Sequence, residues 1–182
     1  LDSVYFGIWS DYDIGCSTDD YSGCDTTRNT EFAYNKNPMD GDGSGGCVTG
    51  LTTYADFPPV QSLTYLSHQM NSYISAPRTF PLLYLPEERY RLLTGVWRDG
   101  TPITVYGDGY NPGSAYPETK FLFHGDPQDT MQWSQYSVHS QFIDPSTVSS
   151  AYLVQLQPFD VVTLETVYMF SQDSNFKHVD QI

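Results

Sequence analysis

Three stretches near the N-terminus decide how this chain is interpreted: SVYFGIW (residues 3–9), DYDIGCSTDDYSGCD (residues 11–25) and TEFAY (residues 30–34). The first is aromatic and β-branched and the third alternates in polarity, so both predict β-strands. The middle stretch holds five aspartates and no Lys or Arg. It predicts an acidic loop at one end of a sheet, whose charge needs a cation or open water.

A second acidic stretch, NKNPMDGDGSGG (residues 35–46), adds Asp40 and Asp42 on a glycine-rich backbone. Hard oxygen ligands on loops suit Ca²⁺, which takes roughly six to eight oxygens. We therefore predict one structural calcium region that holds both loops in place. The predicted ligands are Asp11, Asp13, Asp19, Asp20, Asp25, Asp40 and Asp42. Their spacing does not match an EF-hand loop, so the prediction rests on ligand type and density.

The three cysteines, Cys16, Cys24 and Cys47, flank these acidic stretches. There is no CxxC motif and the four histidines lie far apart in sequence, which argues against a zinc site. A disulfide is the expected role. A bond from Cys16 or Cys24 to Cys47 would tie the acidic stretches together, while a Cys16–Cys24 bond would close a small ring. The sequence does not choose between these pairings.

The composition bounds the fold and the partners. A chain of 182 residues suits one domain with a core, so we predict a single β-sandwich-like domain over residues 1–182. The charged fraction of 16% and the aromatic fraction of 15% argue against a disordered acidic tail. The net charge of −14 argues against nucleic acid, whose binding needs Lys and Arg. No apolar run of about 18 residues occurs, so no membrane insertion is expected.

Short strands, few helices and closely spaced turn signals predict an all-β, mainly antiparallel fold. We expect a β-sandwich or jelly roll with long loops and one short helix. Asp-Gly turns bracket a short β-run at residues 103–106. The last two strands should form an antiparallel pair, with the second strand central. The other expected elements are a short strand at 49–54, two strand pieces within 61–74, a helix at 87–93, and strands at 120–124, 152–157 and 161–170.

Five blocks carry a family resemblance, in this order: DYDIGCSTDDYSGCDTTRNTEFAYNKNPMDGDG, FPPV, YRLLTGVWRDGTPITVYGDGY, FLFHGDP and QPFDVVTLETVYMF. With them, the chain resembles a β-rich domain of large secreted Bacteroidetes proteins exported by the type IX secretion system, which end in a C-terminal sorting domain. The resemblance implies an extracellular or cell-surface module, with neighbouring domains or a surface assembly as its partners. The chain starts without Met, and we expect it to be a fragment of a larger multidomain protein.

Catalysis is the least favoured function. Adjacent carboxylates such as Asp19 with Asp20, or Glu87 with Glu88, could be assigned to the acid and base of a glycoside hydrolase. Neighbouring residues on a strand point apart, however, and a metal would keep the aspartates ionised. No Gly-x-Ser-x-Gly elbow is present. We therefore expect no catalytic residues.

Aromatic side chains in or near predicted loops give an alternative function. Trp97, Tyr106, Tyr110 and Trp133 could stack on sugar rings, as in a carbohydrate-binding module that binds glycans, although aromatic residues also fill sandwich cores. The favoured interpretation is a non-catalytic, extracellular structural or adhesin-type module. It would be stabilised by Ca²⁺ in the acidic loops and joined to its partners through sheet edges.

Overall fold

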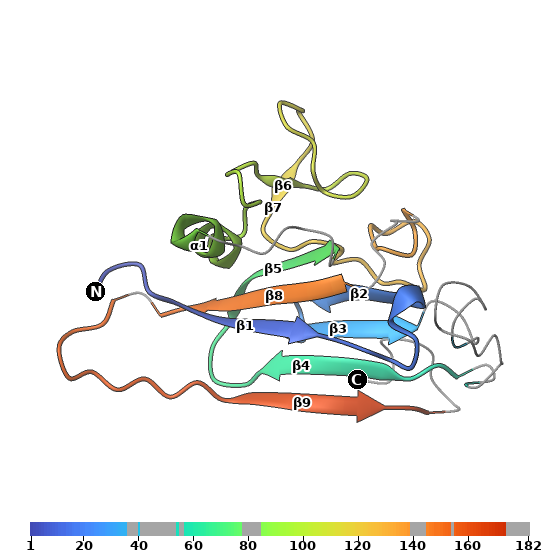
Figure 1. Cartoon of the computed structure of the whole chain (residues 1–182), viewed down its shortest axis with the longest axis horizontal. Coiled ribbons are helices and arrows are strands. Elements are labelled where there is room, and N and C mark those ends of the chain that lie inside the picture. The colour runs from blue at the N-terminus through green and yellow to red at the C-terminus, as the bar shows by residue number, and fades with distance from the viewer. Residues whose placement is uncertain are drawn as a thin grey trace.

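A computed structural model of the chain describes residues 1–35, 40, 54, 57–77, 85–138, 145–153 and 155–173. Two antiparallel sheets pack face to face, so the predicted all-β, sandwich-like fold is confirmed (Figure 1). The elements are β1 (Tyr5–Asp11), a 3₁₀ turn (Ser17–Asp19), β2 (Asp20–Asp25), β3 (Thr30–Asn35), β4 (Val60–Tyr65), β5 (Met70–Pro77), α1 (Pro86–Thr94), β6 (Ile103–Thr104), β7 (Glu118–Thr119), β8 (Pro145–Tyr152) and β9 (Thr166–Ser171).

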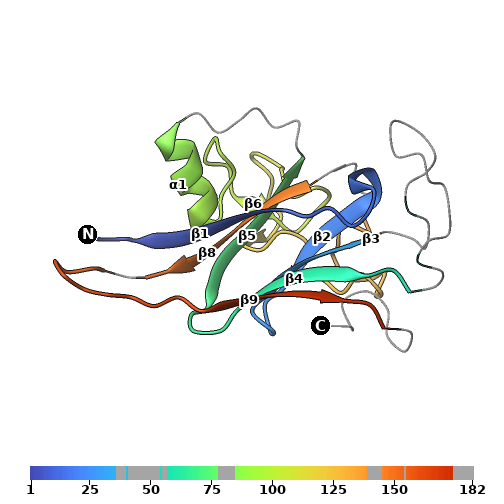
Figure 2. The same ribbon diagram turned by 60° about the horizontal axis from the view of Figure 1, so that its bottom comes forward.

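The two sheets differ in width. The front sheet has the order β1-β8-β5, the back sheet has the order β2-β3-β4-β9, and β6 with β7 forms a small separate hairpin. In Figure 1, β4 and β9 extend beyond β1. Helix α1 packs on the outer face of the front sheet, and Figure 2 shows α1 on one side of β1 and strands β4 and β9 on the other. A Cβ at Gly7 would overlap the Leu93 side chain, so this glycine lets the helix approach β1.

Several predicted elements are confirmed. Strand β3, the two strands β4 and β5, and helix α1 occur where the sequence patterns predict them, and β1 is shifted by two residues. The predicted acidic loop at 11–25 is wrong in its second half, because Asp20–Asp25 is strand β2. It pairs with β3 from Asp20 opposite Asn35 to Asp25 opposite Thr30. The aspartates that suggested a loop lie at its two ends, and Ser22, Gly23 and Cys24 between them are buried.

The C-terminal half departs further from the prediction. Residues 120–124 form no strand; Phe121 makes only an isolated bridge to Tyr73, and Phe123 has a positive φ of 50°. The predicted pairing of the last two strands is wrong as well. Strand β8 lies in the centre of the front sheet, whereas β9 is an edge of the back sheet. The predicted strand 49–54 lies outside the described residues except for Tyr54.

The segment from Lys120 to Gln135 covers one side of the sandwich. Along β5, the Tyr73 N–H donates to the Lys120 carbonyl at 2.9 Å, and the Leu122 N–H donates to the Tyr73 carbonyl at 3.0 Å. Along β2, the Cys24 N–H donates to the Phe123 carbonyl at 3.4 Å. The Ser22 N–H donates to Gln135 Oε1 at 2.7 Å. We call this the closed side. The open side carries the edges of β1 and β9, which pair with no further strand among the described residues.

A carboxylate links the two sheets. Glu31 on β3 is fully buried and accepts hydrogen bonds from Ser10 Oγ at 2.9 Å and Tyr12 Oη at 3.0 Å. Thr147 Oγ1 on β8 donates to its other oxygen at 3.4 Å. Burial raises the pKa of Glu31 from its ordinary value of 4.5 to about 7, although the bonds from Ser10 and Tyr12 oppose the shift. The inner face of the sandwich is therefore polar at its centre.

This carboxylate predicts a stability that falls as pH rises. A carboxyl with a higher pKa in the folded state binds its proton more tightly when folded, so stability is full below about pH 4.5 and declines through about pH 7. The contribution is on the order of 3 kcal/mol. We expect Glu31→Gln to remove most of it. Urea unfolding at pH 5 and pH 8 in EDTA measures this, with the exposed Glu118→Gln as control. An unchanged pH dependence in Glu31→Gln would contradict the assignment.

Candidate functional site

Four aspartates gather where β1 leads into β2, and we call Asp13, Asp19, Asp20 and Asp40 the acidic cluster. Between the strands, Tyr12 and Ile14 are buried while Asp13 is exposed. The 3₁₀ turn then brings Asp19 and Asp20 inside, at 3% and 1% exposure. Their burial is unusual because an ionised carboxylate needs a partner away from water.

Asp40 comes from the second acidic stretch and reaches the first. Its Oδ1 accepts a hydrogen bond from the Cys16 N–H at 2.6 Å. Gly15 has a φ of +69°, and a Cβ there would overlap the Asp40 carboxylate and the Tyr54 hydroxyl. The backbone therefore wraps closely around Asp40, and only glycine allows it. Asp42 lies outside the described residues.

The two carboxylate oxygens of Asp20 have different surroundings. Its Oδ2 accepts the Ile14 N–H at 2.8 Å, whereas its Oδ1 is buried and accepts no hydrogen bond. Burial, together with the charges of Asp19, Asp13 and Asp40, raises the pKa of Asp20 to about 8, although the hydrogen bond from the Ile14 N–H opposes the shift. The buried Asp20 carboxyl would therefore be stabilised by binding a proton or a cation.

The structure places two predicted ligands away from the cluster. Asp11 is exposed at the end of β1 and accepts a hydrogen bond from Ser146 Oγ at 3.2 Å. Asp25 lies at the opposite end of β2 from Asp20 and closes the β2–β3 turn. Its Oδ1 accepts the N–H groups of Thr27 and Arg28 at 2.8 and 3.0 Å, and its Oδ2 pairs with the Arg28 guanidinium at 2.8 Å.

The acidic cluster is not a closed coordination sphere of side chains. Among the described residues, no group of three or more His, Cys, Asp or Glu side chains is arranged to hold a metal ion. A cation at Asp20 would therefore need backbone carbonyls or waters as additional ligands, as Ca²⁺ commonly accepts.

The state of the cysteines excludes one of the three possible disulfide pairings. Cys16 is disulfide-bonded, whereas Cys24 is a free thiol with 1% exposure. The Cys16–Cys24 ring therefore does not form, and Cys47 lies outside the described residues. The Cys24 thiol donates to the Leu122 carbonyl at 3.6 Å. Burial raises the pKa of this thiol well above its usual range, so it is unsuited to nucleophilic chemistry.

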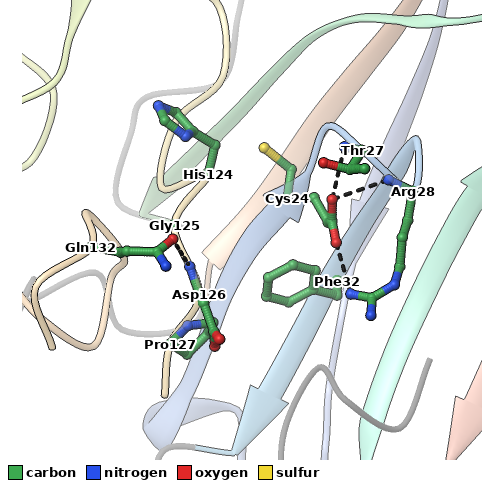
Figure 3. A pocket seen from close by; sticks show the side chains of 10 residues that line it. Cys24, Thr27, Arg28, Phe32, His124, Gly125, Asp126, Pro127 and Gln132 are labelled. Atoms are coloured by element: carbon green, nitrogen blue, oxygen red, sulfur yellow. Dashed lines mark hydrogen bonds and ion pairs between the residues drawn. The ribbon is translucent and has the colours of Figure 1, made fainter. Parts of the chain in front are cut away.

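A pocket of about 280 Å³ lies between the β2–β3 turn and residues 124–132 (Figure 3). Arg28 lines one wall, already paired with Asp25. His124 and Gln132 line the other wall, where Gln132 Oε1 accepts the Asp126 N–H at 3.0 Å. Figure 3 shows no bond between His124 and the Cys24 thiol. Sequence reasoning missed this pocket because its two walls are about a hundred residues apart and share no motif.

The four aromatic candidates separate by burial. Trp97 is 2% exposed and donates from Nε1 to the Gly109 carbonyl at 3.0 Å. Trp133 is half-buried and packs on Phe123. Neither indole therefore lies open on the surface. Tyr106 and Tyr110 are 54% and 43% exposed, so only the tyrosines offer a surface for a sugar.

No match to this chain was found in comparisons with family models, with curated proteins and with solved structures. Within the part of the chain that the structure describes, no helix is long and apolar enough to cross a membrane. The assignment of a function therefore rests on the geometry above and on the resemblance in sequence.

The cysteine assignment predicts a distinct pattern of alkylation. In native protein, Cys24 should resist iodoacetamide because its thiol is buried and protonated. In guanidinium chloride without reductant, the Cys24 peptide should gain the label, while the Cys16 peptide should gain it only after reduction. Mass spectrometry of the digested protein measures both. Rapid labelling of Cys24 in the native protein would contradict its burial.

Proposed function

We propose that this chain is a non-catalytic structural or adhesin-type module of a secreted or surface-attached protein, stabilised by Ca²⁺ at the acidic cluster. Neighbouring domains or a surface assembly would be its partners. The observation that carries the proposal is Asp20 Oδ1, a buried carboxylate oxygen that accepts no hydrogen bond. A buried polar atom of this kind costs about 1 to 3 kcal/mol, and more when it is charged.

A bound cation would stabilise the buried Asp20 carboxylate better than a bound proton would. Protonation would neutralise Asp20 alone, whereas Asp13, Asp19 and Asp40 raise its pKa through their own charges. A divalent cation would offset several of these charges at once. The donors are carboxylate oxygens with no sulfur or imidazole among them, which favours a hard ion. Ca²⁺ tolerates irregular coordination better than Mg²⁺ does.

The carboxylates first considered for catalysis have other roles. Asp19 and Asp20 belong to the acidic cluster. Glu88 lies in the first turn of α1, where Glu88 Oε2 accepts the Leu85 N–H at 3.4 Å. This arrangement supports the helix end, as acidic residues commonly do. These placements support a module without its own catalytic pair.

Two observations support an extracellular location. Cys16 is disulfide-bonded, and disulfides persist mainly in oxidising compartments. The sequence blocks that resemble the β-rich domain of type IX secreted proteins include the whole acidic cluster. A calcium site would fit the same setting, because extracellular modules commonly bind Ca²⁺.

Thermal unfolding in EDTA, Ca²⁺ and Mg²⁺ tests the calcium site. At a concentration about a hundredfold above Kd, Ca²⁺ should add about 2.7 kcal/mol, which is roughly 5 to 10 °C for a chain of this size. Asp20→Asn should lose this rise while remaining folded in EDTA at pH 8, because it removes a buried charge. Asp108→Asn, in an exposed turn, is the matched control. No rise in the wild type, or a full rise in Asp20→Asn, would refute the site.

A carbohydrate-binding role is the second candidate, and one observation favours it. Tyr106 and Tyr116 stack with ring centroids 4.1 Å apart and planes 11° apart, and both are exposed. Tyr110, whose backbone bridges to Ile103 of β6, is also exposed. Flat exposed rings of this kind can stack on sugars.

The glycan alternative predicts retention on insoluble polysaccharides that depends on these rings. Tyr106→Ala should lower retention several-fold, because it removes one face of the stacked pair. Tyr152→Ala, which removes an exposed tyrosine of β8, should leave it unchanged. Sedimentation with a panel of polysaccharides measures the bound fraction. If no polysaccharide retains the wild type, the glycan role is refuted.

A further inference from the structure

The open side of the sandwich has a backbone edge, along β1, that pairs with no strand among the described residues. Leu153 N–H donates to the Val4 carbonyl at 2.8 Å, and Tyr5 lies opposite Tyr152. Since antiparallel pairs alternate between bonded and non-bonded positions, the odd-numbered residues of β1 direct their backbone groups away from β8. Trp9 is one of these residues and is 63% exposed.

The back sheet extends beside this edge, and we call the inner-face side chains of Tyr168 and Phe170 on β9 the floor. Glu31 lies opposite Leu63, and Leu63 lies opposite Tyr168, so Tyr168 shares the inner face with the buried Glu31. Phe170 follows two residues later on the same face. In a complete sandwich both would be covered, yet Tyr168 is 55% and Phe170 is 63% exposed. Counting only described strands, the front sheet has three and the back sheet has four.

We propose that the edge of β1 accepts one further antiparallel strand from a partner, which completes the front sheet above β9. The partner would be an extended segment with apolar side chains at alternate positions, facing Tyr168 and Phe170. The end that lies beside Asp11 would carry Lys or Arg. This inference rests on the proposed role as an assembly module and names its docking surface.

Within the part of the chain that the structure describes, the edge of β1 lacks the features that usually prevent strand addition. Edge strands are commonly protected by Lys, Pro or a covering segment. The strands β1 (YFGIWSD) and β9 (TVYMFS) contain no Lys, Arg or Pro. The closed side, by contrast, is covered along both β5 and β2 by residues 120–135. Residues 120–135 therefore cover the strand edges on the closed side, whereas no described segment covers the edge of β1 on the open side.

The geometry favours a single strand over a second copy of the domain. Strands within a sheet lie about 4.8 Å apart, so one added strand would fit above the overhang of β4 and β9. A second copy joined through β1 would bring its own back sheet or its own α1 into the space that this overhang fills.

The negative charge near the end of β1 favours an incoming strand that carries basic residues. Asp11 is exposed at the end of β1, and the exposed Asp13 follows it. With a net charge of −14, the chain attracts basic partners and repels acidic ones. In an antiparallel addition, the N-terminal end of the incoming strand lies beside Asp11. Basic residues at that end would fix the direction of the strand.

A synthetic peptide tests the proposal with the whole chain. It has about nine residues, since β1 has seven, with two lysines at its N-terminus and then alternating valine and threonine. We expect saturable binding, measured by tryptophan fluorescence and NMR titration. Trp9→Pro removes an outward N–H at an edge, where proline is tolerated, and should weaken binding about tenfold or more. Trp9→Thr keeps that N–H and should weaken binding less.

Further variants test the contribution of the floor and the need for an extended peptide. Phe170→Thr alters the floor without touching β1 and should weaken binding about threefold or more, while the exposed Met131→Thr should not. A peptide with prolines in place of two threonines should not bind. Absence of saturable binding up to millimolar peptide, or equal binding to Trp9→Pro, would overturn the proposal. Self-association lost in Trp9→Pro would also overturn it, in favour of a second copy. The calcium response of Trp9→Pro separates failure of this surface from failure of the proposed module.

Discussion

The structure depends on one constraint: a polar group removed from water must find a partner. The buried Glu31 carboxylate accepts hydrogen bonds from the hydroxyls of Ser10, Tyr12 and Thr147. Ser10 belongs to β1, Tyr12 directly follows β1, and Thr147 belongs to β8. The edges of β5 and β2 meet the same constraint with the segment 120–135, whose irregular backbone follows both strands. Neither solution requires regular secondary structure. Both hold the two sheets in one relative position.

The same constraint identifies two places, among the described residues, where a polar group calls for a partner from outside the chain. Asp20 Oδ1 is enclosed without a donor, and a partner for it must be small because the site is buried. The outward groups of β1 pair with no strand in the described part of the chain, and the exposed rings of Tyr168 and Phe170 lie on the inner face beside them. A partner there must be extended and partly apolar. The two sites therefore differ in ligand: an ion at one and a polypeptide at the other.

Sequence patterns predicted strands β3, β4 and β5 from their alternation of polar and apolar residues. They predicted helix α1 from Pro86 and the two glutamates of its first turn. Strand β8 escaped prediction because Thr147, Ser149 and Ser150, all fully buried, look like surface residues in the sequence. Strand β2 was hidden by its aspartates. At the site, acidic density predicted the grouping of Asp13, Asp19, Asp20 and Asp40, but not that Asp25 is used locally by a turn. The pocket beside Arg28 depends on tertiary contact, which no local pattern encodes.

The polar centre of the sandwich also fixes where β1 and β8 lie over the back sheet. Apolar side chains between two sheets can shift past one another at small cost, whereas hydrogen bonds to a buried carboxylate are directional. The bonds from Ser10 and Thr147 place β1 and β8 over Glu31 on β3. With that register fixed, β4 and β9 must project beyond β1, because no described strand extends the front sheet above them. The buried carboxylate that lowers stability at high pH thus also sets the overhang on which the open side is built.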